Sequence, residues 1–311
     1  MSVTIVSSGL QTTLQDLGRP GLRHLGIPSS GAADRLSSAL ANRLVGNEAS
    51  ALTIEITLTG AKLKFNNNGC FAVVGAQTDI ELNGVSVQAD QSHRYAPGDT
   101  LSLGRSHLGC RAYLAVAGGF IGDEFLGSSG TYLPAGIGGF QGRALTVGDQ
   151  VDMGQSHGPG ISLCEQIRPA MTKTWTLRVT VGAEFEWLSA HSQQALFAHG
   201  FKMGRRADRM GGVLDGPALD IAADPLPSCP VFPGTVQCPP SGTPFLLMAD
   251  AQTTGGYPRI AQVIRADRHF MGQIRPGDRV RLWQVDIDTA TETLWEKNRR
   301  YEQLDIPARV F

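Results

Sequence analysis

Residues 70–88, CFAVVGAQTDIELNGVSVQ, decide the fold class because they are typical of short β-strands joined by tight turns. The apolar and β-branched runs Cys70–Val74 and Asp79–Leu82 lead to Asn83-Gly84, a pair that favours a two-residue hairpin turn. The same pattern of short runs and turn residues continues on both sides. We therefore expect further strands over these segments: Val3–Val6, Thr53–Leu58, Thr100–Leu103 and Arg111–Val116.

One helix interrupts the strands of the first half. Leu36, Leu40 and Leu44 repeat at four-residue spacing, which places them on one face of a helix. Asp34 is a favourable residue for capping its start, and Gly46 is a favourable residue for ending it. This pattern predicts a helix over residues 34–44.

The chain changes character at residues 154–175, a polar stretch that contains Pro169 and that we predict to be a linker. We accordingly expect an N-terminal domain over residues 1–160 and a C-terminal domain over residues 161–311. Helices are predicted over Glu184–His199 and from a capping box at Thr289 and Glu292 to about Leu304. The predicted strands of the second half are Thr176–Val181, Phe245–Met248, Ile260–Ile264 and Val280–Val285.

The composition favours a β-rich protein with many turns. Glycine accounts for 38 of the 311 residues and proline for 17, so turn residues recur every few positions. Strands and helices do not alternate regularly, as a doubly wound sheet requires. We expect a mainly β fold with a few helices, arranged as two linked β-barrel domains.

Charge and motifs exclude several classes of function. A formal net charge of -1 argues against a dedicated nucleic-acid binder. No P-loop and no zinc-ligand spacing occurs, so we predict no metal. The longest charge-free stretch, residues 225–249, contains seven prolines and cannot form a membrane helix. No leader precedes Val3, and the five cysteines form no CxxC pair, so we expect a cytoplasmic protein with reduced thiols.

The first of three polar clusters is QTTLQDLGRPG, residues 11–21. Side chains of this kind form hydrogen bonds to ligands, and the glycines let backbone approach closely. The alternative is a capped turn with Asp16 and Arg19 paired on the surface. The candidate residues of this cluster are Gln11, Thr12, Thr13, Gln15, Asp16 and Arg19.

The second cluster is DAQTTGGYPR, residues 250–259, which follows an apolar strand. A carboxylate, an amide, two hydroxyls, a phenol and a guanidinium within ten residues favour a binding site over a plain turn. The third cluster, residues 205–211, is a basic loop that is suited either to clamping an anion or to a solvated surface. The candidate residues here are Asp250, Gln252, Thr253, Thr254, Tyr257, Arg259 and Arg209.

The string Gln-Thr-Thr occurs in both of the first two clusters, next to Asp16 in one and Asp250 in the other. If the two domains face each other, both strings would line one cleft. One of the two carboxylates would then act as a general base, while threonine and glutamine orient the substrate. We predict Asp16 and Asp250 as the catalytic residues.

Long ordered strings resemble the family of the prokaryotic 5-oxoprolinase C subunit, also called the KipA or allophanate-hydrolase-subunit-2 family. They include GLQTTLQDLGRPGLRHLGIPSSGAADRLSSALANRLVGN, RMGGVLDG, PGTVQCPPSGTPFLLMADAQTTGGYPRIAQVI and GQIRPGDRVRL, and the resemblance extends from Gly9 to about Leu304. It implies two linked cyclophilin-like β-barrel domains. It also implies a protein that opens 5-oxo-L-proline to L-glutamate with ATP, together with the KipI-like B subunit of 5-oxoprolinase and its separate A subunit.

The chemistry of that reaction suggests roles for the clusters. ATP would activate the stable lactam carbonyl, and without a P-loop its site is expected to be shared with, or supplied by, a partner protein. By residue type, Arg259 or Arg209 would hold the substrate carboxylate, and Gln252, Thr253 and Thr254 would orient the lactam. Two alternatives remain open: a non-catalytic regulatory module that docks a partner protein, and a carboxyltransferase-like component of a urea carboxylase-related system, with biotin on another chain.

Overall fold

A computed structural model describes residues 1–155, 167–222 and 226–311. The chain divides into two compact units. Unit 1 consists of Met1–Arg19, Ser30–Met171 and Asn298–Val310, and unit 2 consists of Pro20–Ser29, Thr172–Lys297 and Phe311. The boundary predicted between residues 160 and 161 lies outside the described residues, as do residues 156–166 of the predicted linker.

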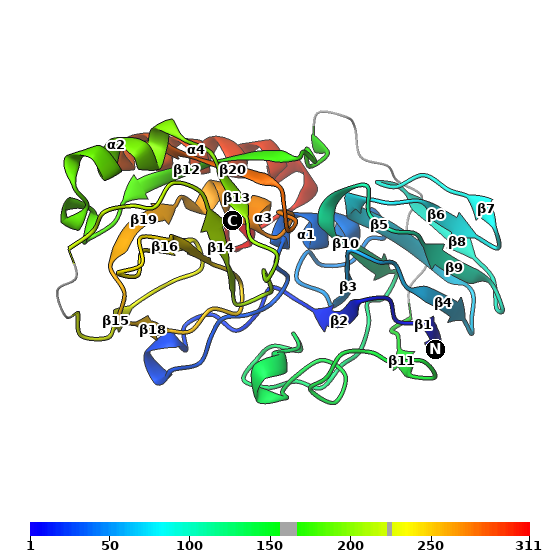
Figure 1. Cartoon of the computed structure of the whole chain (residues 1–311). Coiled ribbons are helices and arrows are strands. Elements are labelled where there is room, and N and C mark those ends of the chain that lie inside the picture. The colour runs from blue at the N-terminus through cyan, green and yellow to red at the C-terminus, as the bar shows by residue number, and fades with distance from the viewer. Residues whose placement is uncertain (156–166, 223–225) are drawn as a thin grey trace. The chain divides into compact units, whose positions relative to one another are not determined.

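Unit 1 is built from two antiparallel sheets (Figure 1). The six-stranded sheet has the order β11-β1-β4-β9-β6-β7, and the five-stranded sheet has the order β2-β3-β10-β5-β8. The strands are β1 Ser2–Ser7, β2 Gln11–Gln15, β3 Thr53–Thr57, β4 Lys62–Phe65, β5 Gly69–Gln77, β6 Ile80–Leu82, β7 Val85–Ser86, β8 Ser92–Tyr95, β9 Thr100–Leu103, β10 Leu108–Val116 and β11 Gln150–Asp152.

The apolar face of each sheet contributes to one shared core. Ile5 and Leu63 come from the first sheet, and Ile54, Phe71 and Leu114 come from the second; all five are at most 1% exposed. The predicted hairpin turn is confirmed, because Asn83 and Gly84 both have positive φ angles (54° and 79°) between β6 and β7. Such a turn matches the right-handed twist of the strands it joins.

The predicted helix of unit 1 is also confirmed. Helix α1, Arg35–Leu44, buries Leu36, Leu40 and Leu44, and packs on strands β3, β5 and β10. The Asp34 carboxylate caps it by accepting from the backbone N–H of Ser37 at 3.0 Å and from the Ser37 hydroxyl at 2.5 Å. Since Asp34 is fully buried, this cap fixes where the helix begins.

Unit 2 contains a closed barrel with the order β12-β19-β16-β17-β14-β13-β20. All neighbours pair antiparallel except β12 and β20, which are parallel. A two-stranded sheet, β15 Cys229–Pro230 with β18 Thr254–Gly255, accompanies it. The barrel strands are β12 Thr174–Val181, β13 Phe201–Met203, β14 Gly211–Asp215, β16 Thr235–Gln237, β17 Phe245–Leu247, β19 Arg259–Val263 and β20 Arg279–Gln284.

Two helix predictions in the second half of the chain need correction. The segment predicted as one helix over Glu184–His199 is a 3₁₀ turn, Phe185–Trp187, followed by α2, Ala190–Ala198. Leu188 and Ser189 are extended between them, and Ser189 caps α2. Helix α4, Ile287–Tyr301, is capped by Asp286 and not by Thr289, because the Asp286 carboxylate accepts from the Thr289 N–H at 2.7 Å. The short helix α3, Arg268–Met271, was not predicted.

These elements confirm the mainly β fold with a few helices. No helix in the described part of the chain has the length and the apolar composition that a membrane span requires. Among the described cysteines, Cys70, Cys110, Cys229 and Cys238 are not in disulfide bonds.

Candidate functional site

A buried polar face on the second sheet of unit 1 is positioned by strand register. Thr13 of β2 pairs with Glu55 of β3, and Glu55 pairs with Tyr113 of β10. Side chains alternate between the two faces along a strand. Leu14, next to Thr13, and Ile54, next to Glu55, therefore point to the apolar core. Thr13, Glu55 and Tyr113 thus lie side by side on the opposite face, and each is at most 1% exposed.

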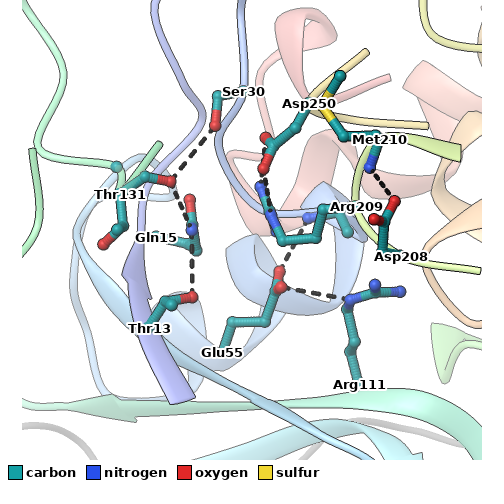
Figure 2. Close-up of polar contacts among 12 residues, drawn as sticks. Thr13, Gln15, Ser30, Glu55, Arg111, Thr131, Asp208, Arg209, Met210 and Asp250 are labelled. Atoms are coloured by element: carbon teal, nitrogen blue, oxygen red, sulfur yellow. Dashed lines mark hydrogen bonds and ion pairs between the residues drawn. The ribbon is translucent and has the colours of Figure 1, made fainter. Parts of the chain in front are cut away.

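Glu55 is the centre of a hydrogen-bond network on this face. Its carboxylate accepts from the Tyr113 hydroxyl at 2.8 Å and from the Ala33 N–H at 2.9 Å, and it lies 3.3 Å from Arg111 Nε. Figure 2 shows the ion pair between Glu55 and Arg111. Burial and the adjacent Glu55 charge raise the pKa of Tyr113 well above its usual value. Tyr113 therefore remains a neutral donor to Glu55, while its oxygen accepts from the Asp34 N–H at 2.7 Å.

Gln15 forms a second group on the same face (Figure 2). Its amide Nε2 donates to Thr13 Oγ1 at 3.1 Å and to the Thr131 carbonyl at 3.0 Å, and Ser30 Oγ donates to that carbonyl at 3.4 Å. These contacts set the orientation of the amide, since the nitrogen must face the carbonyl. The Gln15 Oε1 atom is buried and has no hydrogen-bond partner among the described residues.

Asp16 and Arg19 hold the loop that presents Thr131. Asp16 accepts from Gly18 N at 2.7 Å, Ser128 Oγ at 2.7 Å and Ser129 N at 2.8 Å. The Arg19 guanidinium is 1% exposed and donates to three carbonyls of the same loop: Phe125, Ser128 and Gly130. The alternative of a surface pair between Asp16 and Arg19 is therefore wrong, because Arg19 is buried and both side chains anchor this loop.

The alternative of a capped turn for the first polar cluster also differs from the structure, in which residues 11–15 form strand β2. Gln11 lies half-buried at its start. Thr12 is buried on the other face from Thr13, and its hydroxyl donates to the Ser8 carbonyl. Of the predicted binding residues in this cluster, Thr13 is thus the one that the strand places beside Glu55.

In unit 2, Asp250 and Arg209 form a buried bidentate ion pair (Figure 2). Arg209 Nε donates to Asp250 Oδ2 at 2.7 Å and Nη2 donates to Oδ1 at 2.9 Å. Their side chains are 5% and 2% exposed. Asp208 closes the adjoining loop by accepting from the N–H groups of Met210 and Gly211. The pair orients the Asp250 carboxylate, and each carboxylate oxygen can accept more than one hydrogen bond.

Arg259 forms the equivalent pair with Glu184. Its Nε and Nη2 donate to the two Glu184 oxygens at 2.9 and 2.6 Å, and its Nη1 donates to the Pro230 carbonyl at 3.1 Å. These hydrogen bonds lower the pKa of Glu184. The side-on edges of Arg209 and Arg259 are thus both bound to carboxylates of the chain itself.

The turn between Asp250 and Arg259 presents the remaining predicted residues. Gln252 and Thr253 are half-buried, and Thr254 and Tyr257 are exposed. The Gln252 carbonyl accepts from Arg23, and the Thr253 carbonyl accepts from Val231 N. The backbone of this turn is therefore fixed, while the side chains of Thr254 and Tyr257 face solvent.

Sequence reasoning missed Glu55, Arg111, Tyr113 and Thr131. The one available signal was Glu55 itself, a charged residue in the middle of TIEIT, and its partners come from distant segments. The structure brings together Thr13 with Gln15 in unit 1, and Asp250 with Arg209 in unit 2. That Asp16 and Asp250 line one cleft stays a prediction. Within residues 1–155, 167–222 and 226–311, no three His, Cys, Asp or Glu side chains are placed to hold a metal ion.

Comparison with known proteins places this geometry in a family. The sequence model described as carboxyltransferase domain, subdomain A and B, matches residues 25–284. The chain is 37% identical over 303 residues to the C subunit of 5-oxoprolinase from Escherichia coli (strain K12), and 36% identical over 302 residues to that of Haemophilus influenzae; each alignment covers 96% of both chains. The crystal structure of the K. lactis urea amidolyase superposes with a TM-score of 0.92 at 27% identity, over 99% of this chain and 20% of that chain.

The resemblance predicted from the sequence is thereby confirmed by matches over nearly the whole chain. From its sequence and its fold, the chain belongs to the carboxyltransferase domain family, subdomains A and B, together with the 5-oxoprolinase C subunits.

Proposed function

We propose that this chain is part of an ATP-dependent 5-oxoprolinase that opens 5-oxo-L-proline to L-glutamate together with partner proteins. The observation that carries the proposal is the 37% identity to a protein named as the C subunit of 5-oxoprolinase, over 96% of both chains. The urea amidolyase, in contrast, is matched over only a fifth of its length. A relative that aligns with this chain over nearly the full length of both is the stronger guide to the role of the whole chain.

Each of the two polar groups, taken by itself, offers contacts of the kind that a small cyclic amide can form. A lactam presents an N–H donor and a carbonyl acceptor, and 5-oxoproline adds a carboxylate. In unit 1, the buried Gln15 Oε1 accepts no hydrogen bond from the described residues, so it can accept one from a lactam N–H. In unit 2, Asp250 is held in one orientation by Arg209, as a general base must be. We propose that Asp250 takes a proton from the attacking water.

The other predicted residues fall into two roles. Asp16, Arg19, Arg209 and Arg259 already bind groups within the chain, so we propose that they position the site. Gln252, Thr253, Thr254 and Tyr257 belong to the turn that follows Asp250, and we propose that they contact the substrate, as do Gln11 and Thr13 in the other cluster. Thr12 is not included, because its buried hydroxyl donates to the Ser8 carbonyl.

ATP and the partner proteins complete the proposal. ATP would supply the activation of the lactam carbonyl, which is otherwise a stable amide. The sequence has no P-loop, so we propose that the nucleotide site is shared with, or supplied by, the KipI-like B subunit of 5-oxoprolinase, with its A subunit as a further partner. The complex is proposed to work in the cytoplasm, where thiols such as those of Cys229 and Cys238 stay reduced.

Reconstitution tests this function. The A and B subunits are purified with and without this chain, and 5-oxoproline-dependent ADP release is measured. We expect ADP release to depend on all three chains. Equal activity without this chain would contradict the proposal and favour the regulatory alternative.

A second candidate is a carboxyltransferase component of a urea carboxylase-related system. The TM-score of 0.92 to the urea amidolyase structure and the carboxyltransferase family model favour it. Its test is transfer of a labelled carboxyl group from a biotinylated partner protein to urea. Transfer that requires this chain, without 5-oxoproline turnover, would replace the first proposal.

A further inference from the structure

Arg23 attaches the N-terminal segment of unit 2 to the turn that follows Asp250. Residues Pro20–Ser29 belong to unit 2, and Arg23 begins a short 3₁₀ helix in that segment. Its Nη2 donates to the Val231 carbonyl at 2.5 Å and to the Gln252 carbonyl at 2.8 Å. Arg23 is therefore in direct contact with the turn that carries Gln252, Thr253 and Thr254.

The rest of the Arg23 guanidinium lacks partners in the part of the chain that the structure describes. Nε and Nη1 are both buried and neither forms a hydrogen bond. Burial lowers the pKa of Arg23, which reflects the cost of removing its charge from water. A buried cation is stable only when an anion or a set of acceptors compensates that cost. The two backbone carbonyls both accept from Nη2, so Nε and Nη1 have no anionic partner among residues 1–155, 167–222 and 226–311.

Other arginines of unit 2 show what such a partner looks like. Arg178, Arg209 and Arg259 each hold a carboxylate of the chain, from Asp267, Asp250 and Glu184 respectively. Arg209 and Arg259, which were predicted to bind the substrate carboxylate, thus have their side-on edges occupied. Arg23 contacts the turn at Gln252, and its Nε and Nη1 form no hydrogen bond with the described residues.

We propose that Arg23 binds the carboxylate of the substrate, so that the lactam ring lies against the turn at Gln252. The inference rests on the proposed 5-oxoprolinase function and assigns a specificity-determining residue to it. A guanidinium N–H to carboxylate hydrogen bond is charge-assisted and stronger than a neutral one.

The aromatic ring of Phe232 explains how the carboxylate reaches Arg23. It lies over the guanidinium, with 5.3 Å between Arg23 Cζ and the ring centroid, and is itself 47% exposed. An exposed ring can rotate to another rotamer at little cost. Phe232 is thus the side chain that would move when substrate enters.

The test compares two lactams in the reconstituted complex of this chain with the A and B subunits. 5-Oxoproline carries the carboxylate, and 2-pyrrolidinone is the same ring without it. We expect Arg23→Met to raise the KM for 5-oxoproline about 10- to 100-fold, the range of charge-assisted hydrogen bonds. The kcat/KM for 2-pyrrolidinone, or its inhibition constant where it is not turned over, should change by less than about threefold. Arg279→Met, at an exposed position on β20, is the matched control and should leave both unchanged.

The ratio between the two substrates separates recognition from structure. If Arg23 only supports the turn, Arg23→Met lowers activity on both lactams by the same factor, and the proposal is overturned. A raised KM for ATP with an unchanged KM for 5-oxoproline would place a phosphate at Arg23 and overturn it as well. Recovery of 5-oxoproline activity in Arg23→Ala by added guanidinium would support it. A wild-type complex that releases no ADP with 5-oxoproline would overturn the proposed function itself, and this inference with it.

Discussion

At the scale of single residues, the buried charges of this chain are compensated by specific partners. Glu55 is 1% exposed and forms an ion pair with Arg111, whose side chain is 7% exposed. Burying two ions costs several kcal/mol each, and this cost is recovered only when both are paired and hydrogen-bonded. Tyr113 and the Ala33 N–H supply those additional hydrogen bonds to Glu55. The polar face of β2, β3 and β10 is therefore sensitive to the loss of one charge.

Glu55→Gln should destabilise the protein by about 3 kcal/mol, because it removes the charge that is paired with buried Arg111. The free energy of unfolding, measured by urea denaturation, checks this. Glu81→Gln is the matched control, since Glu81 lies exposed on β6 and should change stability by less than about 0.5 kcal/mol. Equal stabilities of the two variants would show that the Glu55 charge is not needed.

Asp250→Asn should lower the kcat for 5-oxoproline about 100-fold, because an amide cannot take a proton from water. ADP release by the reconstituted complex is the measurement. Asp215→Asn, at the exposed end of β14, is the control and should retain wild-type turnover. Full turnover by Asp250→Asn would rule out its role as the base.

At the scale of elements, local patterns predicted most strands and helix α1, and long-range contacts decided what those patterns missed. Asn83-Gly84 requires only its own backbone geometry, and Asp34 lies three residues before the N–H it accepts from. The break at Leu188 and Ser189 depends on packing that the sequence of Glu184–His199 does not reveal.

The candidate site divides in the same way. The polar density of residues 250–259 was visible because its members are neighbours in sequence. The partners of Glu55 were not, because Thr13, Tyr113 and Ala33 reach it through strand register and a loop. For the same reason, the partners that occupy Arg209 and Arg259 could not be predicted from the basic loop or the Gly-Gly turn alone.

Asp34→Ala should destabilise unit 1 by about 1–2 kcal/mol, because the first turn of α1 loses a buried cap. Thermal unfolding followed by circular dichroism measures the change. Asp286→Ala removes the cap of α4 at an exposed position and should cost less. A larger loss of stability in Asp286→Ala would show that burial does not increase the contribution of a helix cap to the free energy of unfolding.

Alkaline pH should weaken the β8 region of unit 1 through Tyr95. Burial raises the pKa of Tyr95 from its usual 10 to about 12, and its ring is stacked on Phe65 with centroids 3.7 Å apart. A pKa that is higher in the folded state gives stability that is fully present below pH 10 and is lost as the pH rises toward 12. Tyr95→Phe should therefore show a shallower loss of unfolding free energy between pH 10 and 12. An identical slope in the variant would assign the alkaline loss to other groups.

At the scale of the whole molecule, each unit depends on a segment from the other end of the sequence. Residues 20–29, between two segments of unit 1, belong to unit 2, and residues 298–310, after the main segment of unit 2, belong to unit 1. Arg23 anchors the first segment on Val231 and Gln252, and Arg43 anchors the second on Leu304 and Asp305. Two exchanges of this kind make the chain harder to divide than two domains joined by a single linker.

Co-expressed fragments 1–171 and 172–311 should therefore purify as one complex, because each fragment carries a segment that completes the other's unit. Size-exclusion chromatography of a singly tagged pair measures the association. In the pair that carries Arg23→Ala and Arg43→Ala, both anchors lose their hydrogen bonds, so the fragments should separate at lower urea concentration than the unsubstituted pair. Arg279→Ala, on the exposed side of β20, is the control and should not change that concentration. Fragments that fold and elute separately without any substitution would show that each unit is complete without the exchanged segment. They would also show that the hydrogen bonds of Arg23 to Val231 and Gln252 do not hold the two fragments together.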